Sequence, residues 1–214
     1  MRNLPHDEAA VVGQGFPDAV IARRSSVLSF CLASLKQTDV TLFRHSMNVK
    51  AIAARLMSAV GVNGSTAQIV DWGCLLHDVG KTFVPDDVLR KPGRYSEPEA
   101  LIMRNHTLIG YKLLTKLDVF FPHEVLDIVL FHHERPGGKG YPNQMEELPF
   151  HVEVAAVCDV ASAMQEHRHY RKGHSLEAAL EEVLKHKWHS DLIRVLNQKP
   201  SVFVIAECDR WLCV

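Results

Sequence analysis

The sequence feature that constrains the fold most is the stretch Leu75–Lys81, where an apolar run ends in an adjacent histidine and aspartate. A carboxylate inside a protein core needs a partner, because burying an unpaired charge is strongly unfavourable. His77 and Asp78 can hold one divalent metal ion or bridge two. Lys81 follows three residues after Asp78 and offers a cation to an anionic substrate. Since a lone His-Asp pair is more often surface decoration, its meaning depends on what else converges on it.

Composition and charge describe an ordinary globular chain. Of its 214 residues, 47% are hydrophobic and 23% are charged, which predicts one domain with a real core. The formal net charge of −1 predicts no general attraction to DNA or to an anionic membrane. No apolar run approaches the roughly 20 residues that span a bilayer. Five cysteines without a Cys-x-x-Cys pair argue against a thiolate zinc site, and with no signal peptide they predict a cytoplasmic protein.

Apolar residues recur at helical spacing along most of the chain, which predicts an all-α fold. Two capping boxes, Ser65 with Gln68 and Ser96 with Glu99, are expected to begin helices. The glycine- and proline-rich segments 82–95 and 135–142 are expected to be irregular. Residues 190–214 are ambiguous: the apolar positions of 192–196 suggest a helix, whereas 201–205 could be helix or strand. The expected helices cover residues 19–36, 39–60, 65–77, 97–117, 122–133, 149–166 and 176–188.

Seven histidines and aspartates lie on, or at the end of, apolar helical faces. Any one of these histidines alone is more often a core residue bonded to a carbonyl, but seven unrelated buried polar groups would need seven separate sets of partners. A helical bundle can direct such side chains into one cavity. Imidazole and carboxylate ligands without thiolate suit iron, manganese, zinc or nickel, and seven ligands predict two metal ions bridged by Asp78. The candidate ligands are His45, His77, Asp78, His106, His132, His133 and Asp159.

These residues resemble the HD-GYP branch of the HD metal-dependent phosphohydrolases over about residues 39–188. The resemblance implies an all-α HD-domain bundle with a dinuclear metal centre in its core. It also implies hydrolysis of cyclic dinucleotides, chiefly cyclic di-GMP to linear pGpG and sometimes on to GMP. The matching pieces are His45-Ser46, His77-Asp78-Val79-Gly80-Lys81, Asn105-His106, His132-His133-Glu134, Gly140-Tyr141-Pro142, Asp159 and Arg168-x-x-Arg171.

The resemblance assigns expected roles to these positions. The seven candidate ligands match the metal ligands of the family, with iron or manganese expected first and zinc, nickel or cobalt as alternatives. Asp78 and Lys81 are the expected catalytic residues. Lys81, Tyr141, Arg168 and Arg171 are expected to bind substrate. The expected organisation is an N-terminal arm and helix (1–38), the catalytic domain (39–188) and a C-terminal extension packed on the bundle (189–214).

Three departures from the family pattern leave alternatives open. Thr41 replaces the glutamate of members with a third metal, so two metals and a stop at pGpG are expected. Gly137 replaces the usual aspartate of the glycine-rich loop, and Met164-Gln165 replaces Leu-Thr. A non-catalytic receptor that binds the nucleotide and signals through a protein partner is therefore one alternative. A phosphodiesterase for cyclic GMP-AMP is another.

Overall fold

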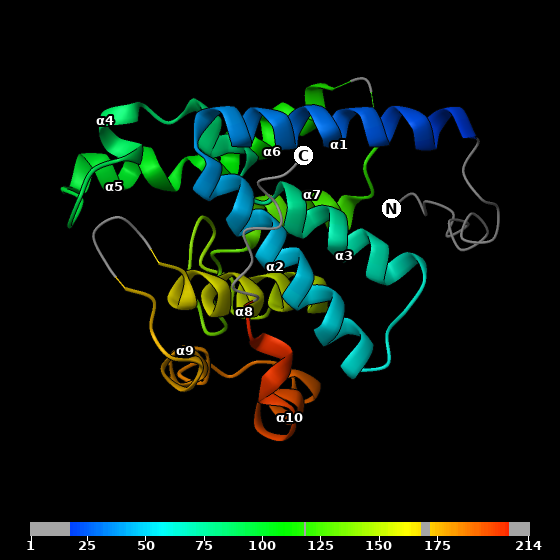
Figure 1. Ribbon diagram of the computed structural model, residues 1–214, viewed down its shortest axis with the longest axis vertical. Helices are drawn as coiled ribbons and strands as arrows, with labels where there is room; N and C mark the ends of the chain where they lie inside the picture. Colours follow the sequence, from blue (N-terminus) through cyan, green and yellow to red (C-terminus); the bar gives the residue numbers. More distant parts are fainter. Residues whose placement is uncertain (1–17, 118, 168–171, 206–214) are drawn as a thin grey trace, which may run out of the picture.

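The computed structural model describes residues 18–117, 119–167 and 172–205, and these residues form a bundle of helices without a strand. Figure 1 shows α1 lying across the bundle above α2 and α3, with α8 below α2 and the C-terminal helices at the far end. The all-α expectation is confirmed. The elements are α1 (Asp18–Thr38), α2 (Val40–Ala59), α3 (Ser65–Leu76), η1 (Val79–Phe83), α4 (Asp86–Leu89), α5 (Glu97–Arg104), α6 (His106–Lys116), α7 (His123–Phe131), α8 (Phe150–Gln165), α9 (Leu176–Val183), α10 (Ser190–Gln198) and η2 (Pro200–Phe203), where η marks a 3-10 helix.

The main core lies where α2 packs against α3 and α8. The expected stripe of α2 supplies Val49, Ile52 and Leu56, each at most 1% exposed. Helix α8 is buried along almost its whole length, which fits its run of small and β-branched residues. A second cluster forms around Leu114 of α6 and Val125 and Val129 of α7. The candidate ligands lie on the helices that these two clusters hold together.

Several helix starts follow the expected capping chemistry. The Asp39 side chain accepts a hydrogen bond from the Thr41 N–H at 2.7 Å and begins α2. Ser96 and Glu99 form the expected capping box of α5. The Ser65 capping box is wrong, because the N-cap of α3 is Gly64 with φ of +68° and Ser65 is already helical. Glycine takes this left-handed backbone conformation without steric cost, so it can begin the helix without a side-chain cap.

Three segments differ from the sequence-based expectation. The helix expected over 97–117 is broken at Asn105 into α5 and α6, so His106 begins a new helix. Segment 82–95 is not wholly irregular, since it contains the end of η1 and the short helix α4. Helix α9 ends at Val183 and not near Trp188, whose indole N–H donates to the Val183 carbonyl at 2.6 Å.

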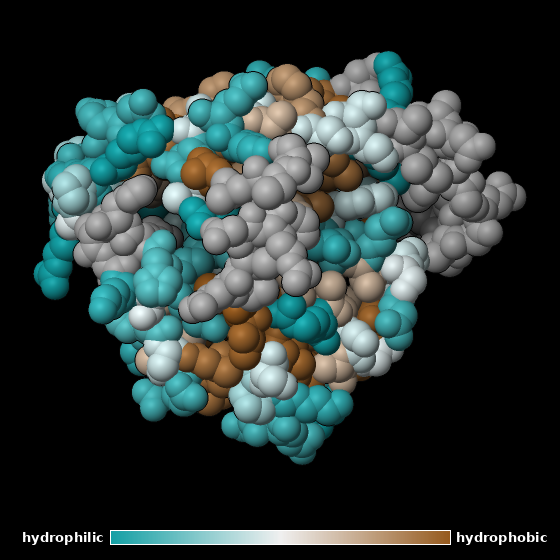
Figure 2. Space-filling model, viewed as in Figure 1, coloured by the Kyte–Doolittle hydropathy of each residue, from teal (hydrophilic) through white to brown (hydrophobic). Residues whose placement is uncertain are grey.

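Of the ambiguous segment 190–214, the described part forms α10 and η2, and residues 206–214 lie outside the described residues. Helix α10 begins beside α8, where the buried Glu153 carboxylate accepts a hydrogen bond from the His189 N–H at 2.7 Å. Arg55 of α2 then donates to the carbonyls of Val202 and Val204 at 2.9 and 2.6 Å. Figure 2 shows a largely hydrophilic face, with hydrophobic atoms reaching the surface between α8 and α10. These contacts fasten residues 189–204 to the bundle.

Candidate metal centre

The structure brings all seven candidate ligands together at the centre of the bundle. Five different helical segments supply them: α2, the end of α3, the start of α6, the end of α7 and the middle of α8. Except for His133, each is at most 7% exposed. The expectation that these side chains converge is therefore met by the geometry. They are His45, His77, Asp78, His106, His132, His133 and Asp159.

Close backbone packing positions two of the ligand-bearing segments. His77 ends α3, and Asp78 begins the 3-10 turn η1. Gly80 lies against the first turn of α6, where an added Cβ would overlap with the His106 carbonyl and lie 2.6 Å from the Gly110 nitrogen. Only glycine allows this approach. The break at Asn105 and the glycine at position 80 together place His106 opposite Asp78.

The Asp78 carboxylate faces two groups of histidines with its two oxygens. Its Oδ1 lies 3.3 Å from His106 Nε2 and 3.8 Å from His132 Nε2. Its Oδ2 lies 3.3 Å from His77 Nε2 and 3.9 Å from His45 Nε2. Ligand atoms of Asp78, His106, His132 and His133 lie within 4.8 Å of one another, as do those of His45, His77 and Asp78. A carboxylate shared by two such groups has the arrangement of a bridging ligand.

Asp159 reaches the same space from α8. Its Oδ1 lies 2.9 Å from His45 Nε2 and 4.0 Å from His77 Nε2, and its Oδ2 lies 3.9 Å from His133 Nδ1. The expected need of this buried carboxylate for a partner is met by histidines, and no arginine among the described residues pairs with it. Asp159 thus contacts histidines of both groups from α8.

The donor set fits divalent metal ions. His77 Nε2 and Asp78 Oδ1 are buried, and neither has a hydrogen-bond partner within the described part of the chain. Such orphaned atoms are rare, and a bound ion is one explanation for them. Metal-binding histidines usually donate their second ring N–H to a fixed acceptor. Three of these histidines direct Nδ1 to a main-chain carbonyl three or four residues earlier: His77 to Cys74 at 2.8 Å, His106 to Met103 at 2.6 Å and His132 to Ile128 at 3.1 Å.

Burial and mutual proximity shift the pKa values of the cluster in opposite directions. Burial lowers the pKa of His132 and His133, which keeps both imidazoles neutral and able to bind a metal ion. The pKa of Asp78 lies well below its usual value because His77 and Lys81 outweigh the effect of burial. The pKa of His45 is raised to about 10, since the carboxylates of Glu166 and Asp159 outweigh burial. Asp78, His132 and His133 are thus in the protonation states that bind a cation, whereas His45 is held in its protonated form.

Lys81 forms an ion pair with the Asp78 carboxylate. Its Nζ donates to Asp78 Oδ2 at 2.6 Å, and its side chain is 18% exposed. This ion pair compensates part of the buried negative charge. Its ammonium group sits between the ligand cluster and solvent, where it can meet a phosphate.

The glycine-rich loop covers one side of the cluster. The Tyr141 ring stacks on His133 with ring centroids 4.7 Å apart and an interplanar angle of 22°. The guanidinium of Arg104 lies 5.3 Å from the centroid of the same ring. Arg104 was not expected from the sequence, although it directly precedes the Asn105-His106 motif. Tyr141 and Arg104 therefore lie at the edge of the ligand cluster.

Glu134 fixes this loop from beneath. Its carboxylate is completely buried and accepts hydrogen bonds from the N–H groups of Asn143 at 2.5 Å and Met145 at 3.1 Å. Gly140 packs so closely on the backbone of Glu134 that a Cβ would overlap with it. Gly137, which replaces the usual aspartate, takes a φ of +79° and donates its N–H to the Glu146 carbonyl at 2.9 Å. The loop is therefore ordered by its own backbone without that aspartate.

Two expected substrate-binding residues, Arg168 and Arg171, lie outside the described residues. The described residues end at His167 before this segment and resume at Lys172 after it. Glu166, at the near edge of this segment, contacts His45 with its carboxylate. Sequence analysis did not predict that contact, because Glu166 stands at the start of a basic run that is typical of a solvated loop.

Comparisons with known proteins agree with the fold and the cluster. The HD domain family matches residues 30–191. The chain is 36% identical over 131 residues to the cyclic di-GMP phosphodiesterase response regulator RpfG of Xanthomonas campestris. The aligned residues cover 60% of this chain and 35% of that protein. It is 32% identical over 175 residues to a cyclic di-GMP phosphodiesterase of Pseudomonas aeruginosa, covering 81% of this chain and 42% of that protein. Relatives from Vibrio cholerae at 30–31% identity are named 3'3'-cGAMP-specific phosphodiesterases.

A solved structure shows the same fold. The HD domain of the Listeria monocytogenes phosphodiesterase PgpH superposes with a TM-score of 0.59 at 17% identity, covering 81% of this chain and 94% of that one. The fold and the cluster define an all-α metal-binding domain, and the chain belongs to the HD domain family. This confirms the expected kinship with the HD-GYP branch.

The chain spans 35% and 42% of the length of the two cyclic di-GMP phosphodiesterases. Within the described ranges, no helix is long and apolar enough to cross a membrane.

Proposed function

We propose that this chain is a metal-dependent phosphodiesterase that hydrolyses cyclic di-GMP to linear pGpG, in the cytoplasm. The observation that carries the proposal is the Asp78 carboxylate, which turns one oxygen to each of two histidine groups. The names of the relatives, cyclic di-GMP phosphodiesterases among them, support the reaction type. We assign residues 39–188 to the catalytic domain and residues 189–214 to an extension of it.

The proposed cofactor is a pair of divalent cations, iron or manganese. When bound, such ions would supply Lewis-acid activation of a water molecule and of a phosphoryl oxygen. His45, His77, Asp78 and Asp159 would hold one ion, and Asp78, His106, His132 and His133 would hold the other. The short contacts among these groups and the orphaned atoms His77 Nε2 and Asp78 Oδ1 support this division.

The remaining residues bind and orient the substrate. Lys81 approaches the cluster from the solvent side and is placed to neutralise charge on a phosphodiester. Tyr141, whose ring stacks on His133 at the edge of the cluster, is proposed to contact the nucleotide together with Arg104. Arg168 and Arg171 are proposed to hold the phosphates, on the strength of the family resemblance.

The experiment that tests the proposal combines metal analysis with product analysis. Protein purified anaerobically with manganese or iron should contain metal and convert cyclic di-GMP to pGpG. Asp78→Asn should lose metal and at least about a hundredfold in kcat, since metal catalysis contributes several kcal/mol. Asp127→Asn removes a carboxylate of α7 that pairs with His151 of α8 and belongs to neither ligand group, and this variant should behave as wild type. Full activity and metal content in Asp78→Asn would refute the assignment.

Two alternatives give different outcomes in the same experiment. A non-catalytic receptor binds cyclic di-GMP and yields no pGpG, and would act through a signalling protein. An enzyme for 3'3'-cGAMP turns over that nucleotide faster than cyclic di-GMP, as the names of some relatives indicate for those proteins. Appearance of GMP would show that hydrolysis continues beyond pGpG.

A further inference from the structure

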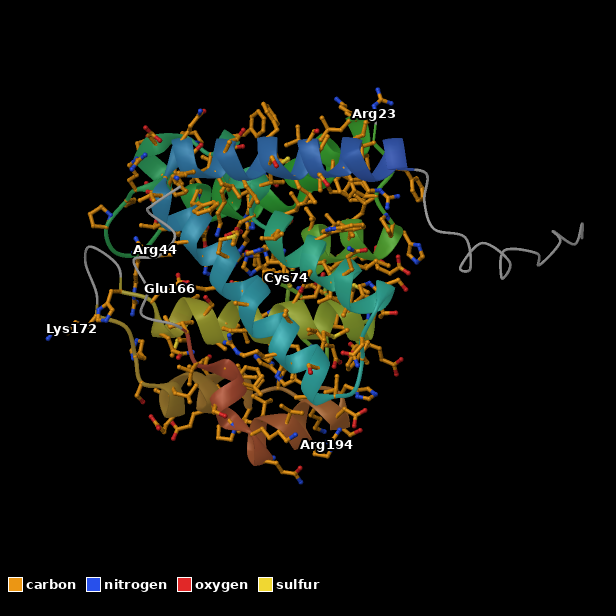
Figure 3. All side chains as sticks on the ribbon, turned by 45° about the vertical axis from the view of Figure 1, so that its right-hand side comes forward. Arg23, Arg44, Cys74, Glu166, Lys172 and Arg194 are labelled. Carbon is orange, nitrogen blue, oxygen red and sulfur yellow. The ribbon has the colours of Figure 1, made fainter. Side chains whose placement is uncertain are left out.

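Glu166 is a partly buried carboxylate that contacts His45 from outside the ligand cluster. It follows the last residue of α8, and Figure 3 shows it at that end of the helix, close to the first turns of α2. Both of its carboxylate oxygens lie 3.1 Å from His45 Nδ1. The other ring nitrogen of His45, Nε2, lies 2.9 Å from Asp159 Oδ1 inside the cluster. Glu166 and the candidate metal site thus occupy opposite edges of one imidazole ring.

Two neutral donors hold the Glu166 carboxylate in this orientation. Asn48 Nδ2 donates to its Oε1 at 3.0 Å, and Ser162 Oγ donates to the same oxygen at 2.7 Å. Asn48 lies three residues after His45 on α2, and Ser162 lies three residues after Asp159 on α8. The side chain of Glu166 is only 14% exposed. A carboxylate fixed by both ligand-bearing helices cannot turn away from the imidazole without losing these bonds.

His45 differs in this respect from three other histidines of the cluster. His77, His106 and His132 direct Nδ1 to neutral main-chain carbonyls, whereas His45 directs it to a charged carboxylate. A carboxylate acceptor fixes the tautomer with the proton on Nδ1 and makes the opposite nitrogen a stronger ligand. Removal of such a partner typically weakens metal affinity about 10- to 100-fold.

We propose that Glu166 is a positioning residue that holds His45 for metal binding and sets the affinity of the half-site formed by His45, His77, Asp78 and Asp159. Loss of the Glu166 charge should weaken this half-site alone, because its contacts do not reach His106, His132 or His133. The inference rests on the proposed metal centre and is independent of which nucleotide is the substrate.

The test is a titration of the metal-free full chain with Mn²⁺ alone, in which the binding is measured by calorimetry. Glu166→Gln should weaken one of the two binding steps by about 10- to 100-fold and leave the other unchanged. Saturating Mn²⁺ should then recover much of the activity, which separates a loss of metal from a loss of fold. An isotherm identical to that of wild type would overturn the proposal.

Glu153→Gln is the matched control. It removes the same charge from the same helix, at a buried glutamate that accepts a hydrogen bond from the His189 N–H and makes no contact with the cluster. Its Mn²⁺ isotherm should match that of wild type, whatever its melting temperature. Equal weakening in Glu153→Gln and Glu166→Gln would mean that general destabilisation is the cause, and would overturn the proposal.

A second variant tests the role of the charge directly. Ser162 Oγ lies 3.5 Å from His45 Nδ1, so an aspartate there can bring a carboxylate to the same nitrogen. Ser162→Asp combined with Glu166→Gln should restore the weakened step to within a few-fold of wild type. A folded double variant that binds Mn²⁺ as weakly as Glu166→Gln overturns the proposal. If wild type binds Mn²⁺ without producing pGpG, the proposed function fails while the role of Glu166 stands.

Discussion

The Nε2 atoms of His106 and His132 face each other at 3.3 Å in the buried centre of the protein. Both rings direct Nδ1 to main-chain carbonyls, so a neutral imidazole at either position presents a bare Nε2. Two lone pairs that face each other in a core repel, and a cation between or beside them removes the repulsion.

Metal ions should therefore stabilise the fold. At a thousandfold excess over its Kd, a bound ion contributes about 4 kcal/mol, which corresponds to a rise of roughly 10 °C in melting temperature for a chain of this size. Thermal unfolding after chelation and with added Mn²⁺ measures the shift. Ca²⁺ is the control, because it prefers oxygen ligands and should give little effect. Equal shifts with Ca²⁺ and Mn²⁺ would contradict an imidazole-rich site.

Substitution of Gly80 should disturb both stability and metal binding. A methyl group at this position overlaps with the His106 carbonyl, so Gly80→Ala must push η1 away from α6 at a cost of about 3 kcal/mol. Urea unfolding measures this loss, and Mn²⁺ titration should show weaker binding because Asp78 and His106 move apart. Gly93→Asn is the control: a Cβ there meets nothing within 4 Å, so only the smaller backbone strain of a φ of +91° is expected, without any effect on Mn²⁺ binding. Wild-type stability in Gly80→Ala would show that this approach is not essential.

Arg104 should contribute to substrate binding. Its guanidinium lies over Tyr141 at the edge of the cluster, where it can contact a phosphate or a base. Arg104→Ala should raise KM about tenfold with little change in kcat, because a charge-assisted contact is worth about 1.5–3 kcal/mol. Arg194→Ala removes an exposed arginine of α10 that pairs with Asp191, and should leave KM unchanged. A fall in kcat alone would instead assign Arg104 to the chemical step.

The metal-free protein should lose stability as the pH rises from 6.5 to 10. The pKa of His45 is raised in the folded state to about 10, from 6.5, because Glu166 and Asp159 outweigh burial. A raised histidine pKa contributes stability in full below 6.5, and this contribution disappears as the pH rises through the folded value. Urea unfolding of chelated wild type and His45→Gln at several pH values measures it. The difference between the two should shrink toward pH 10, and a constant difference would contradict the prediction.

Glu134 should control the order of the loop that carries Tyr141. Glu134→Gln turns an amide N–H toward the N–H of Asn143 or Met145 and leaves a buried donor unsatisfied, at about 1–3 kcal/mol. Amide hydrogen exchange over residues 137–146 should therefore increase. Glu146→Gln is the control, because its main chain and not its side chain accepts the bond from the Gly137 N–H. Unchanged exchange in Glu134→Gln would show that the loop is held by other contacts.

The sequence predicted those features that depend on periodicity and on adjacent residues. His45 and Val49 share a helical face, and both are buried, because residues four apart lie on one side of a helix. The break at Asn105 was missed because the apolar stripe of Ile102, Ile109 and Leu113 continues across it. The start of α3 at Gly64 was missed because a left-handed glycine leaves no side-chain signature.

Contacts between distant segments set the rest of the site. Glu166 reaches His45 across 121 positions of the chain, and Arg104 meets Tyr141 only after the loop folds over His133. Neither contact leaves a local pattern, since each depends on how separate helices pack. The seven candidate ligands could be predicted from the sequence because each is a polar group on an apolar face, where burial without a partner is unfavourable in free energy. Glu166 and Arg104 stand among other polar residues in the sequence, so no local pattern distinguishes them.

The turn His132-His133-Glu134 contributes both to the ligand cluster and to the support of the loop. Two of its side chains enter the ligand cluster, and the third holds the backbone of the loop above it. A nucleotide that displaces the loop must therefore strain the same turn that aims both imidazoles. Under the proposed function, a loop movement that releases the product is therefore expected to loosen the ions held by His132 and His133 as well.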